Sequence, residues 1–261
     1  MSSKQINGVD DVKSLFNSAV DDGDLSTQAS VLMINSLDGS NLVGCMGAAI
    51  DDIETDDVTL VSTVLDASAS MSNFKSVVKE AYDKSIQAYK GSKTAGSILA
   101  STRTFHSSQN IIHGFKKVEE IDKIGSDYNP IGNSTALYDA LIDALTGIKA
   151  YSKTLNDNGV RTKCVVVVYS DGEDNDSNKT AANVKTISKD LLASEKFYLV
   201  YVGFQHNQND DLKKVASAMG FPNVLTAAAT ESEIRKAIDL VSKSIIRTSQ
   251  TQIGKSNTFF N

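Results

Sequence analysis

Apolar and polar positions alternate in two different periods along this chain, and the pattern is clearest from residue 59 onward. Residues 59–65 form a short apolar, β-branched run, which is typical of a buried strand. Residues 136–149 place leucine and isoleucine along one face of a helix. Residues 163–169, KCVVVVY, give the strongest strand signal in the chain. The sequence therefore predicts a mixed α/β fold.

The remaining elements are predicted from the same two periods. Further strands are expected at 97–105, 111–118, 196–204 and 223–226. We expect the 111–118 strand at an edge of the sheet, because charges and a glycine interrupt it. Further helices are expected at 72–89, 177–193, 210–219 and 230–247. The last helix begins with a capping box, Thr230-x-x-Glu233.

Strands that alternate with helices indicate a parallel sheet covered on both faces. We therefore predict a Rossmann-like, doubly wound α/β domain with a mostly parallel sheet over residues 58–247. Residues 1–57 form an N-terminal extension, either a cap packed on the main domain or a docking segment. Within it, the spacing of Val12, Leu15, Phe16 and Val20 predicts an amphipathic helix, and 29–34 reads as a strand. Residues 248–261 form a tail that we expect to be flexible.

Composition argues against several classes of protein. Twenty-six basic residues against 32 acidic ones give a net charge of −6, which argues against a general nucleic-acid surface. No apolar run approaches the roughly 20 residues that span a bilayer, and no signal-like segment opens the chain, so we expect a cytoplasmic protein. Cys45 and Cys164 have no CxxC spacing, which argues against a disulfide framework or a zinc–cysteine site, and we expect Cys164 to be a buried thiol.

The most informative string is Asp66-Ala67-Ser68-Ala69-Ser70, at the end of the first buried strand. A carboxylate and two hydroxyls at alternate positions converge if the loop curls around a centre. Hard oxygen ligands of this kind suit Mg²⁺ or Ca²⁺ better than Zn²⁺ or Cu²⁺. Alone the string is equally typical of an ordinary turn or helix cap, because aspartate and serine are common at both.

Two further segments bear on this alternative. Thr135 precedes the 136–149 helix, and Asp171-Gly172 follows the 163–169 strand. Ligands of a doubly wound sheet bind at the carboxyl ends of its strands, where the strand order reverses. If the 59–65 strand is central and the 163–169 strand lies beside it, five oxygen-bearing side chains face one cavity. They are Asp66, Ser68, Ser70, Thr135 and Asp171.

The strings DASAS, GNSTALYDAL and VVVVYSDG resemble, in the correct order, the three parts of the metal ion-dependent adhesion site of von Willebrand factor type A domains. The resemblance covers about residues 58–247. It implies that the five residues bind Mg²⁺, with Mn²⁺ or Ca²⁺ as alternatives, and that an open coordination position takes an Asp or Glu carboxylate of a protein partner. Ala69 replaces a common glycine and Ser170 a common threonine. Such a module acts as an adaptor, in some cases beside AAA+ ATPases, and is not an enzyme.

Three alternatives stay open at this point. One is a metal-dependent phosphate-ester hydrolase with Asp66 as nucleophile, although Ser68 stands where haloacid dehalogenase-type enzymes have a second aspartate. Another is a structural scaffold with a vestigial site. The third concerns the acidic residues Glu173, Asp174 and Asp176. They indicate a solvated loop, or else a second ion site or an acidic rim that selects basic residues beside the partner's carboxylate.

Overall fold

The computed structural model describes residues 5–39, 41–172, 174–205, 211–251 and 259–260. Six strands form a single sheet in the order β3-β2-β1-β4-β5-β6. All neighbouring strands are parallel except β2 and β3, which form an antiparallel pair at one edge. The strands are β1 (Asp57–Asp66), β2 (Ile98–Phe105), β3 (Gln109–Lys117), β4 (Arg161–Ser170), β5 (Phe197–Gln205) and β6 (Asn223–Ala228). The predicted fold class and the edge position of 111–118 are confirmed.

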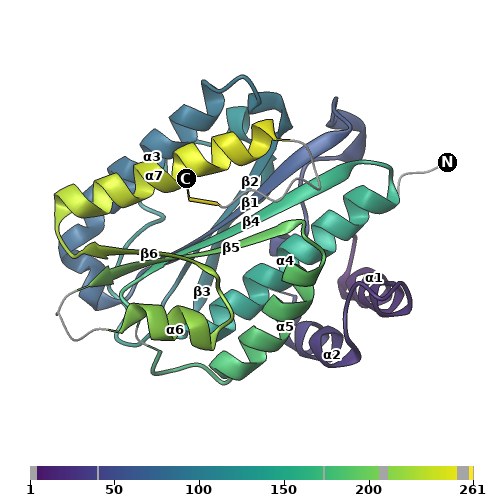
Figure 1. Ribbon diagram of the computed structural model, residues 1–261, viewed down its shortest axis with the longest axis horizontal. Helices are drawn as coiled ribbons and strands as arrows, with labels where there is room; N and C mark the ends of the chain where they lie inside the picture. Colours follow the sequence, from purple (N-terminus) through teal and green to yellow (C-terminus); the bar gives the residue numbers. More distant parts are fainter. Residues whose placement is uncertain (1–4, 40, 173, 206–210, 252–258, 261) are drawn as a thin grey trace.

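The central strands are apolar on both sides because helices cover both faces of the sheet. Along β1, Leu60 and Val64 belong to the core on one face, and Val61 and Leu65 to the core on the other. Figure 1 shows α3 (Lys75–Lys90) and α7 (Glu231–Gln250) together on the face of Val61 and Leu65. The helices on the face of Leu60 and Val64 are α4 (Leu137–Asp157), α5 (Ala181–Ala193) and α6 (Leu212–Ala218).

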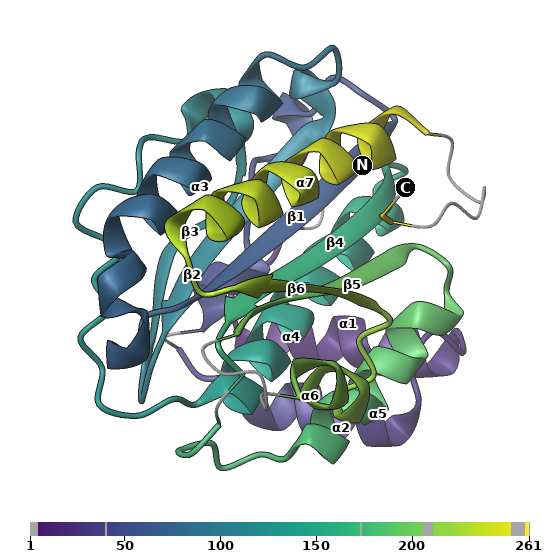
Figure 2. The same ribbon diagram turned by 60° about the vertical axis from the view of Figure 1, so that its left-hand side comes forward.

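The N-terminal extension packs outside α4 and α5, as Figure 2 shows. It contains α1 (Val9–Asp21), the predicted amphipathic helix, and α2 (Thr27–Ser36). The predicted strand at 29–34 is therefore wrong. Ser26 explains the helix, because its Oγ accepts a hydrogen bond from the backbone N–H of Ala29 and caps the first turn. Short 3-10 turns occur at η1 (Leu42–Cys45), η2 (Ile50–Asp52), η3 (Ala69–Phe74), η4 (Ala95–Ser97) and η5 (Val118–Glu120).

Apolar and charged contacts hold the extension on α4. Phe16 and Met33 are fully buried in the core that also contains α4. Lys149 and Lys153 of α4 are nearly buried, and their Nζ atoms lie 3.2 Å from Asp24 and 3.3 Å from Asp22. The extension thus shares its core with the sheet. Where an independently folding domain begins stays a prediction.

The turn η1 approaches α4 so closely that a side chain does not fit between them. A Cβ atom on Gly147 would overlap the carbonyl oxygen of Gly44. Beside this contact lies a buried polar cluster, in which Asp143 accepts hydrogen bonds from the side chains of Asn41 and Gln109, and Arg103 donates to Gln109. Burial raises the pKa of Asp143 to about 6, and the nearby Arg103 charge opposes that rise.

The C-terminal residues differ from the expected flexible tail. Residues 252–258 and 261 lie outside the described residues, but Phe259 is buried and its ring lies 5.9 Å from that of Tyr198. Helix α7 extends to Gln250, and Lys163 of β4 donates to the carbonyl of Thr248 at 2.7 Å. Both cysteines are buried free thiols, as expected for Cys164. Within the described part of the chain, no helix combines the length and apolar character needed to cross a membrane.

Candidate metal site

The candidate site lies where β1 and β4 end side by side. The last residues that pair these two strands are Leu65 and Tyr169, so Asp66 and Ser170, which end the strands, lie at the same end of the sheet. The strand order reverses between β1 and β4, because β2 and β3 lie on one side and β5 and β6 on the other. In doubly wound folds this switch point is where ligands bind. The expected adjacency of the two strands is confirmed.

Asp66 is the most firmly held residue of the site, and its side chain is 1% exposed. Its Oδ1 accepts a hydrogen bond from the backbone N–H of Ser68 at 2.8 Å. Its Oδ2 accepts one from the hydroxyl of Ser170 at 2.7 Å. The hydroxyl of Tyr128 donates to the backbone carbonyl of Asp66 at 2.9 Å. Two hydrogen bonds thus hold the carboxylate of Asp66, and a third holds its backbone.

The electrostatics around Asp66 favour a cation. The pKa of Asp66 is raised to about 6, chiefly by burial and in smaller part by the charge of Asp171, while hydrogen bonds from Ser68 and Ser170 oppose the rise. Two carboxylates therefore influence each other in a place with little water. A divalent ion near them would offset the repulsion between the two carboxylates, because its own charge dominates the local field.

Ser68 and Ser70 form the second part of the site. Their hydroxyl oxygens lie 2.9 Å apart, with Ser68 buried and Ser70 exposed. The N–H of Ala69 donates to the carbonyl of Gly132 at 2.7 Å, which fixes this loop against the one that leads to Thr135. Glu195 is the only described non-glycine residue with a positive φ angle, so alanine at position 69 carries no backbone strain.

Thr135 is positioned by the loop that follows β4. Its N–H donates to Oδ1 of Asn175 at 2.8 Å, and the N–H of Asn175 donates back to its carbonyl at 3.0 Å. Helix α4 has no side-chain cap of its own. Instead, the Oγ of Ser177 accepts from the N–H of Tyr138 at 3.0 Å. The distant loop therefore supplies the cap that a helix N-terminus needs.

Two acidic residues after Asp171 accept hydrogen bonds from nearby hydroxyl groups. Asp174 accepts from the hydroxyl of Ser177 at 2.6 Å, and Asp176 accepts from that of Ser134 at 2.8 Å. The bond from Ser134, and one from the N–H of Tyr138 to Asp174 at 3.3 Å, hold the loop against the start of α4. Asp176 is exposed, as expected for a solvated loop, and Asp174 is half-buried. Glu173 lies outside the described residues.

The glycine after Asp171 is required by the backbone. Gly172 has a φ of +93°, and a Cβ atom there would lie 2.9 Å from the hydroxyl oxygen of Tyr201. Its N–H donates to the Oγ of Ser170 at 3.0 Å. The chain thereby turns sharply just past Asp171, whose side chain stays 8% exposed.

Three loops are thus linked in pairs around one point. Asp66 is bonded to Ser170, Ala69 to Gly132, and Thr135 to Asn175. Direct bonds connect Asp66, Ser68 and Ser70, whereas Thr135 is positioned by Asn175 and Asp171 directly follows the end of β4. Among the described residues, no group of three or more His, Cys, Asp or Glu side chains is placed to hold a metal ion. Any ion here would depend on hydroxyl ligands as well as carboxylates.

The residues that sequence reasoning missed are the ones that support the ligands. The sequence marks Ser170 only as a replacement for threonine, and it gives no sign of the role of Ser177. The partners of Asn175 and Ser177 lie about forty positions earlier in the chain. An asparagine within an acidic run was the one visible cue, since Asn and Asp commonly bond to backbone groups in turns.

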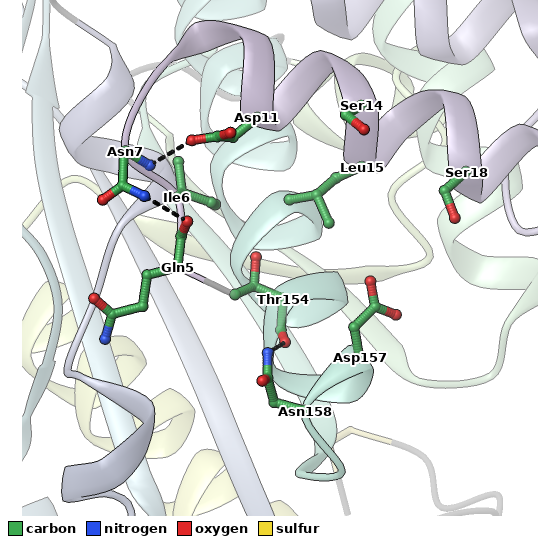
Figure 3. A pocket seen from close by; sticks show the side chains of 10 residues that line it. All are labelled: Gln5, Ile6, Asn7, Asp11, Ser14, Leu15, Ser18, Thr154, Asp157 and Asn158. Atoms are coloured by element: carbon green, nitrogen blue, oxygen red, sulfur yellow. Dashed lines mark hydrogen bonds between the residues drawn. The ribbon is translucent and has the colours of Figure 1, made fainter. Parts of the chain in front are cut away.

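A groove of ≈360 Å³ lies away from this site, between the N-terminal segment, α1 and the last turn of α4 (Figure 3). Asp11 in the groove accepts bonds from the N–H groups of Asn7 and Gly8, and so caps α1. The last turn of α4 directly precedes the start of β4, whereas Asp66 lies at the carboxyl end of β1. The groove therefore lies at the opposite end of the strands from Asp66. It has no part in the candidate metal site.

Comparison with known sequences gives one family match. The model of the von Willebrand factor type A domain family matches residues 61–240, which is more than half of the chain. A search of curated proteins found no match.

Comparison with solved structures shows the same fold. The pilus adhesin SpaC from Lactobacillus rhamnosus GG, in its open conformation, has 12% identity and a TM-score of 0.56, covering 75% of this chain and 30% of its own. The D319A mutant of the PilB minor pilin from Streptococcus sanguinis has 12% identity and a TM-score of 0.53, covering 75% and 63%. A von Willebrand factor type A protein from Catenulispora acidiphila has 12% identity and a TM-score of 0.53, covering 73% and 43%. The chain spans less than two thirds of each of these structures.

Proposed function

The chain belongs to the von Willebrand factor type A domain family, a family of protein-interaction and adhesion modules, and from that premise we infer that it binds a partner protein through a divalent metal ion. Asp66, Ser68, Ser70, Thr135 and Asp171 would hold the ion. Mg²⁺ fits this set best, with Mn²⁺ or Ca²⁺ as alternatives, because the donors are two carboxylates and three neutral hydroxyls.

The chemistry of the donor set supports this proposal. Two carboxylates balance the charge of a divalent ion without exceeding it. When bound, the ion supplies a positive centre with an open position for an incoming carboxylate. The partner would therefore present an Asp or Glu side chain. Ser70 is exposed, so the proposed ligand set reaches the surface.

The main support for the proposal is the set of hydrogen bonds between the loops around the site. Three loops from distant parts of the chain are linked in pairs, through Asp66 to Ser170, Ala69 to Gly132 and Thr135 to Asn175. An ordinary turn or helix cap needs only local bonds. Cross-links of this kind are expected where ligands from several loops must be held in place before an ion arrives.

We further propose that the site is not catalytic. Both carboxylate oxygens of Asp66 accept bonds from the protein, which suits a fixed support better than an attacking nucleophile. Asp66-dependent hydrolysis of a phosphate ester in the presence of Mg²⁺ would contradict this. As a partner we propose a protein in an intracellular assembly, including one built around an AAA+ ATPase. The cytoplasmic location stays a prediction.

Thermal and urea unfolding with and without Mg²⁺ or Mn²⁺ tests the ion site. At a hundredfold excess over its dissociation constant, an ion that binds only the folded protein adds about 2.7 kcal/mol to the free energy of unfolding. Thr135→Val keeps the shape of the side chain and removes its hydroxyl, so we expect at least a tenfold loss of ion affinity. Asp66→Asn removes one of the two proposed carboxylate ligands and should weaken ion binding; Asp122→Asn, at an exposed position, is its matched control.

The possible results separate the remaining alternatives. If 10 mM Mg²⁺ or Mn²⁺ leaves the unfolding of the wild-type protein unchanged, the ion site does not function, as a vestigial scaffold requires. If an ion binds, pull-down of partners in Mg²⁺ and in chelator tests the second half of the proposal. Equal capture of partners in Mg²⁺ and in chelator would contradict ion-dependent partner binding.

A further inference from the structure

Ile131 is the most exposed of the four large apolar side chains that stand out at the surface of the described residues, at 69%. It lies in the loop that leads to Thr135. Single exposed apolar residues are common on protein surfaces and need no explanation by themselves. The setting of Ile131 is different, because its neighbours on both sides, Pro130 and Gly132, are buried.

The backbone around Ile131 is held next to the proposed ion ligands. The N–H of Gly132 donates to the carbonyl of Ala67 at 3.2 Å, and its carbonyl accepts from Ala69. Gly132 and Ser68 thereby form an isolated parallel bridge. On the other side, Lys75 of α3 donates to the side chain of Asn129 at 2.6 Å. The loop therefore displays Ile131 from a backbone that is fixed on both sides.

The distance suits a contact beside a docked carboxylate. Bridged strands lie about 4.8 Å apart and consecutive Cα atoms 3.8 Å apart, so the Cα of Ile131 lies within about 9 Å of that of Ser68. A partner residue adjacent to the acidic one is likewise about 3.8 Å away along its own chain. These backbone spacings are compatible with a contact between exposed Ile131 and the residue beside an acidic group bound to the ion.

We propose that Ile131 determines specificity, by packing against an apolar side chain next to the acidic residue through which the partner binds the ion. The partner is a protein segment with an acidic residue directly beside an aliphatic one. This inference rests on the proposed ion-dependent binding. The ion supplies attraction to any carboxylate, and the apolar contact selects among them.

Blocked tripeptides with a single carboxylate provide the probes: acetyl-Gly-Asp-Gly-amide, acetyl-Leu-Asp-Gly-amide and acetyl-Gly-Asp-Leu-amide. Binding is measured by amide NMR titration of the full chain in saturating Mg²⁺. We expect at least one leucine peptide to bind wild type about fivefold more tightly than the glycine peptide, as partial burial of a leucine would give. Ile131→Ser should lose that preference and keep the affinity for the glycine peptide and for Mn²⁺.

Two further variants complete the design. Ile131→Leu keeps an apolar surface and should retain the preference. Val43→Ser removes another exposed apolar side chain, from η1, and should change nothing. Equal binding of all three peptides to wild type, or an unchanged preference in Ile131→Ser, overturns the role of Ile131. Absence of Mg²⁺-dependent binding for every peptide overturns the proposed partner binding itself, so the two failures are distinct.

Discussion

The backbone N–H of Thr135 and the side chain of Asn175 are joined by a 2.8 Å hydrogen bond, although the two residues are separated by all of α4 and β4. The return bond from the N–H of Asn175 to the carbonyl of Thr135 closes a small ring between the two loops. One proposed ligand is thus positioned by a residue that does not itself belong to the proposed ligand set. The loop after β4 controls both Asp171 and Thr135.

Asn175→Ala should weaken ion binding without unfolding the protein. Residues that orient metal ligands typically change affinity by 10- to 100-fold when replaced. We expect about a tenfold loss of Mn²⁺ affinity in a calorimetric titration, because Thr135 loses its support. Asn17→Ala, at an exposed position on α1, is the control. Equal affinities in both variants would show that Thr135 needs no support from this loop.

The buried cluster around Asp143 should make stability depend on pH in an unusual direction. The pKa of Asp143 is about 6 in the folded protein, against about 3.9 in an unfolded chain. As the pH falls below 6, the folded state takes up this proton first, so the free energy of unfolding rises until the unfolded chain is protonated too. Its contribution should increase by about 1 kcal/mol from pH 7 to pH 5.

Urea unfolding in chelator at these two pH values tests that contribution. Most other carboxylates act in the opposite sense, so the comparison is with Asp143→Asn, which lacks the titrating group. The gap between wild type and Asp143→Asn should change with pH by about 1 kcal/mol in favour of wild type at pH 5. A gap that is the same at both values would exclude the assigned pKa shift.

Phe16→Ala tests whether the N-terminal extension folds with the sheet. Phe16 is fully buried in the core that contains α4, and such a truncation typically costs about 3–5 kcal/mol. We expect one unfolding transition, shifted as a whole to lower urea, when it is followed both by circular dichroism and by tyrosine fluorescence. An early partial transition, with the main one unmoved, would mean that α1 and α2 form a separate unit.

Gly147→Ala should be destabilising although alanine favours helices. The exchange gains about 1 kcal/mol in helix propensity, but the new Cβ would overlap the carbonyl oxygen of Gly44. We expect a net loss of about 1–3 kcal/mol in the free energy of unfolding, as for overpacked sites. Gly96→Ala has open space around the new atom and provides the control. An increase in the free energy of unfolding of Gly147→Ala would mean that η1 moves away from α4 without cost, which would contradict this prediction.

The sheet was predictable because its strands carry strong signals. The run 163–169 is apolar without interruption, as burial on both faces demands, and the charges and glycine in 111–118 marked the edge strand. The run 29–34 misled because six apolar or small residues fit a buried strand and a buried helix equally well. Ser26 was the cue, as an N-cap three residues before Ala29.

The site was predictable only in part. The five proposed ligands follow strand ends or precede a helix, and a family resemblance connects them. Their supporting bonds are not legible in the sequence, because Ser170, Asn175 and Ser177 act through partners distant in the chain. Phe259 escaped prediction for the same reason, since a phenylalanine beyond a polar stretch gives no sign of where it packs.

The touching backbones of Gly44 and Gly147 offer a way to recognise relatives that share this architecture. A chain of the same family with a bulky residue at the equivalent point of its fourth helix has no space there for a turn like η1. Glycine at that point, together with a glycine-bearing segment ahead of the first strand, would therefore mark members whose N-terminal region folds back in the same manner. The glycine of the helix can be sought in an alignment of the main domain alone, and a glycine in the preceding segment would support the assignment.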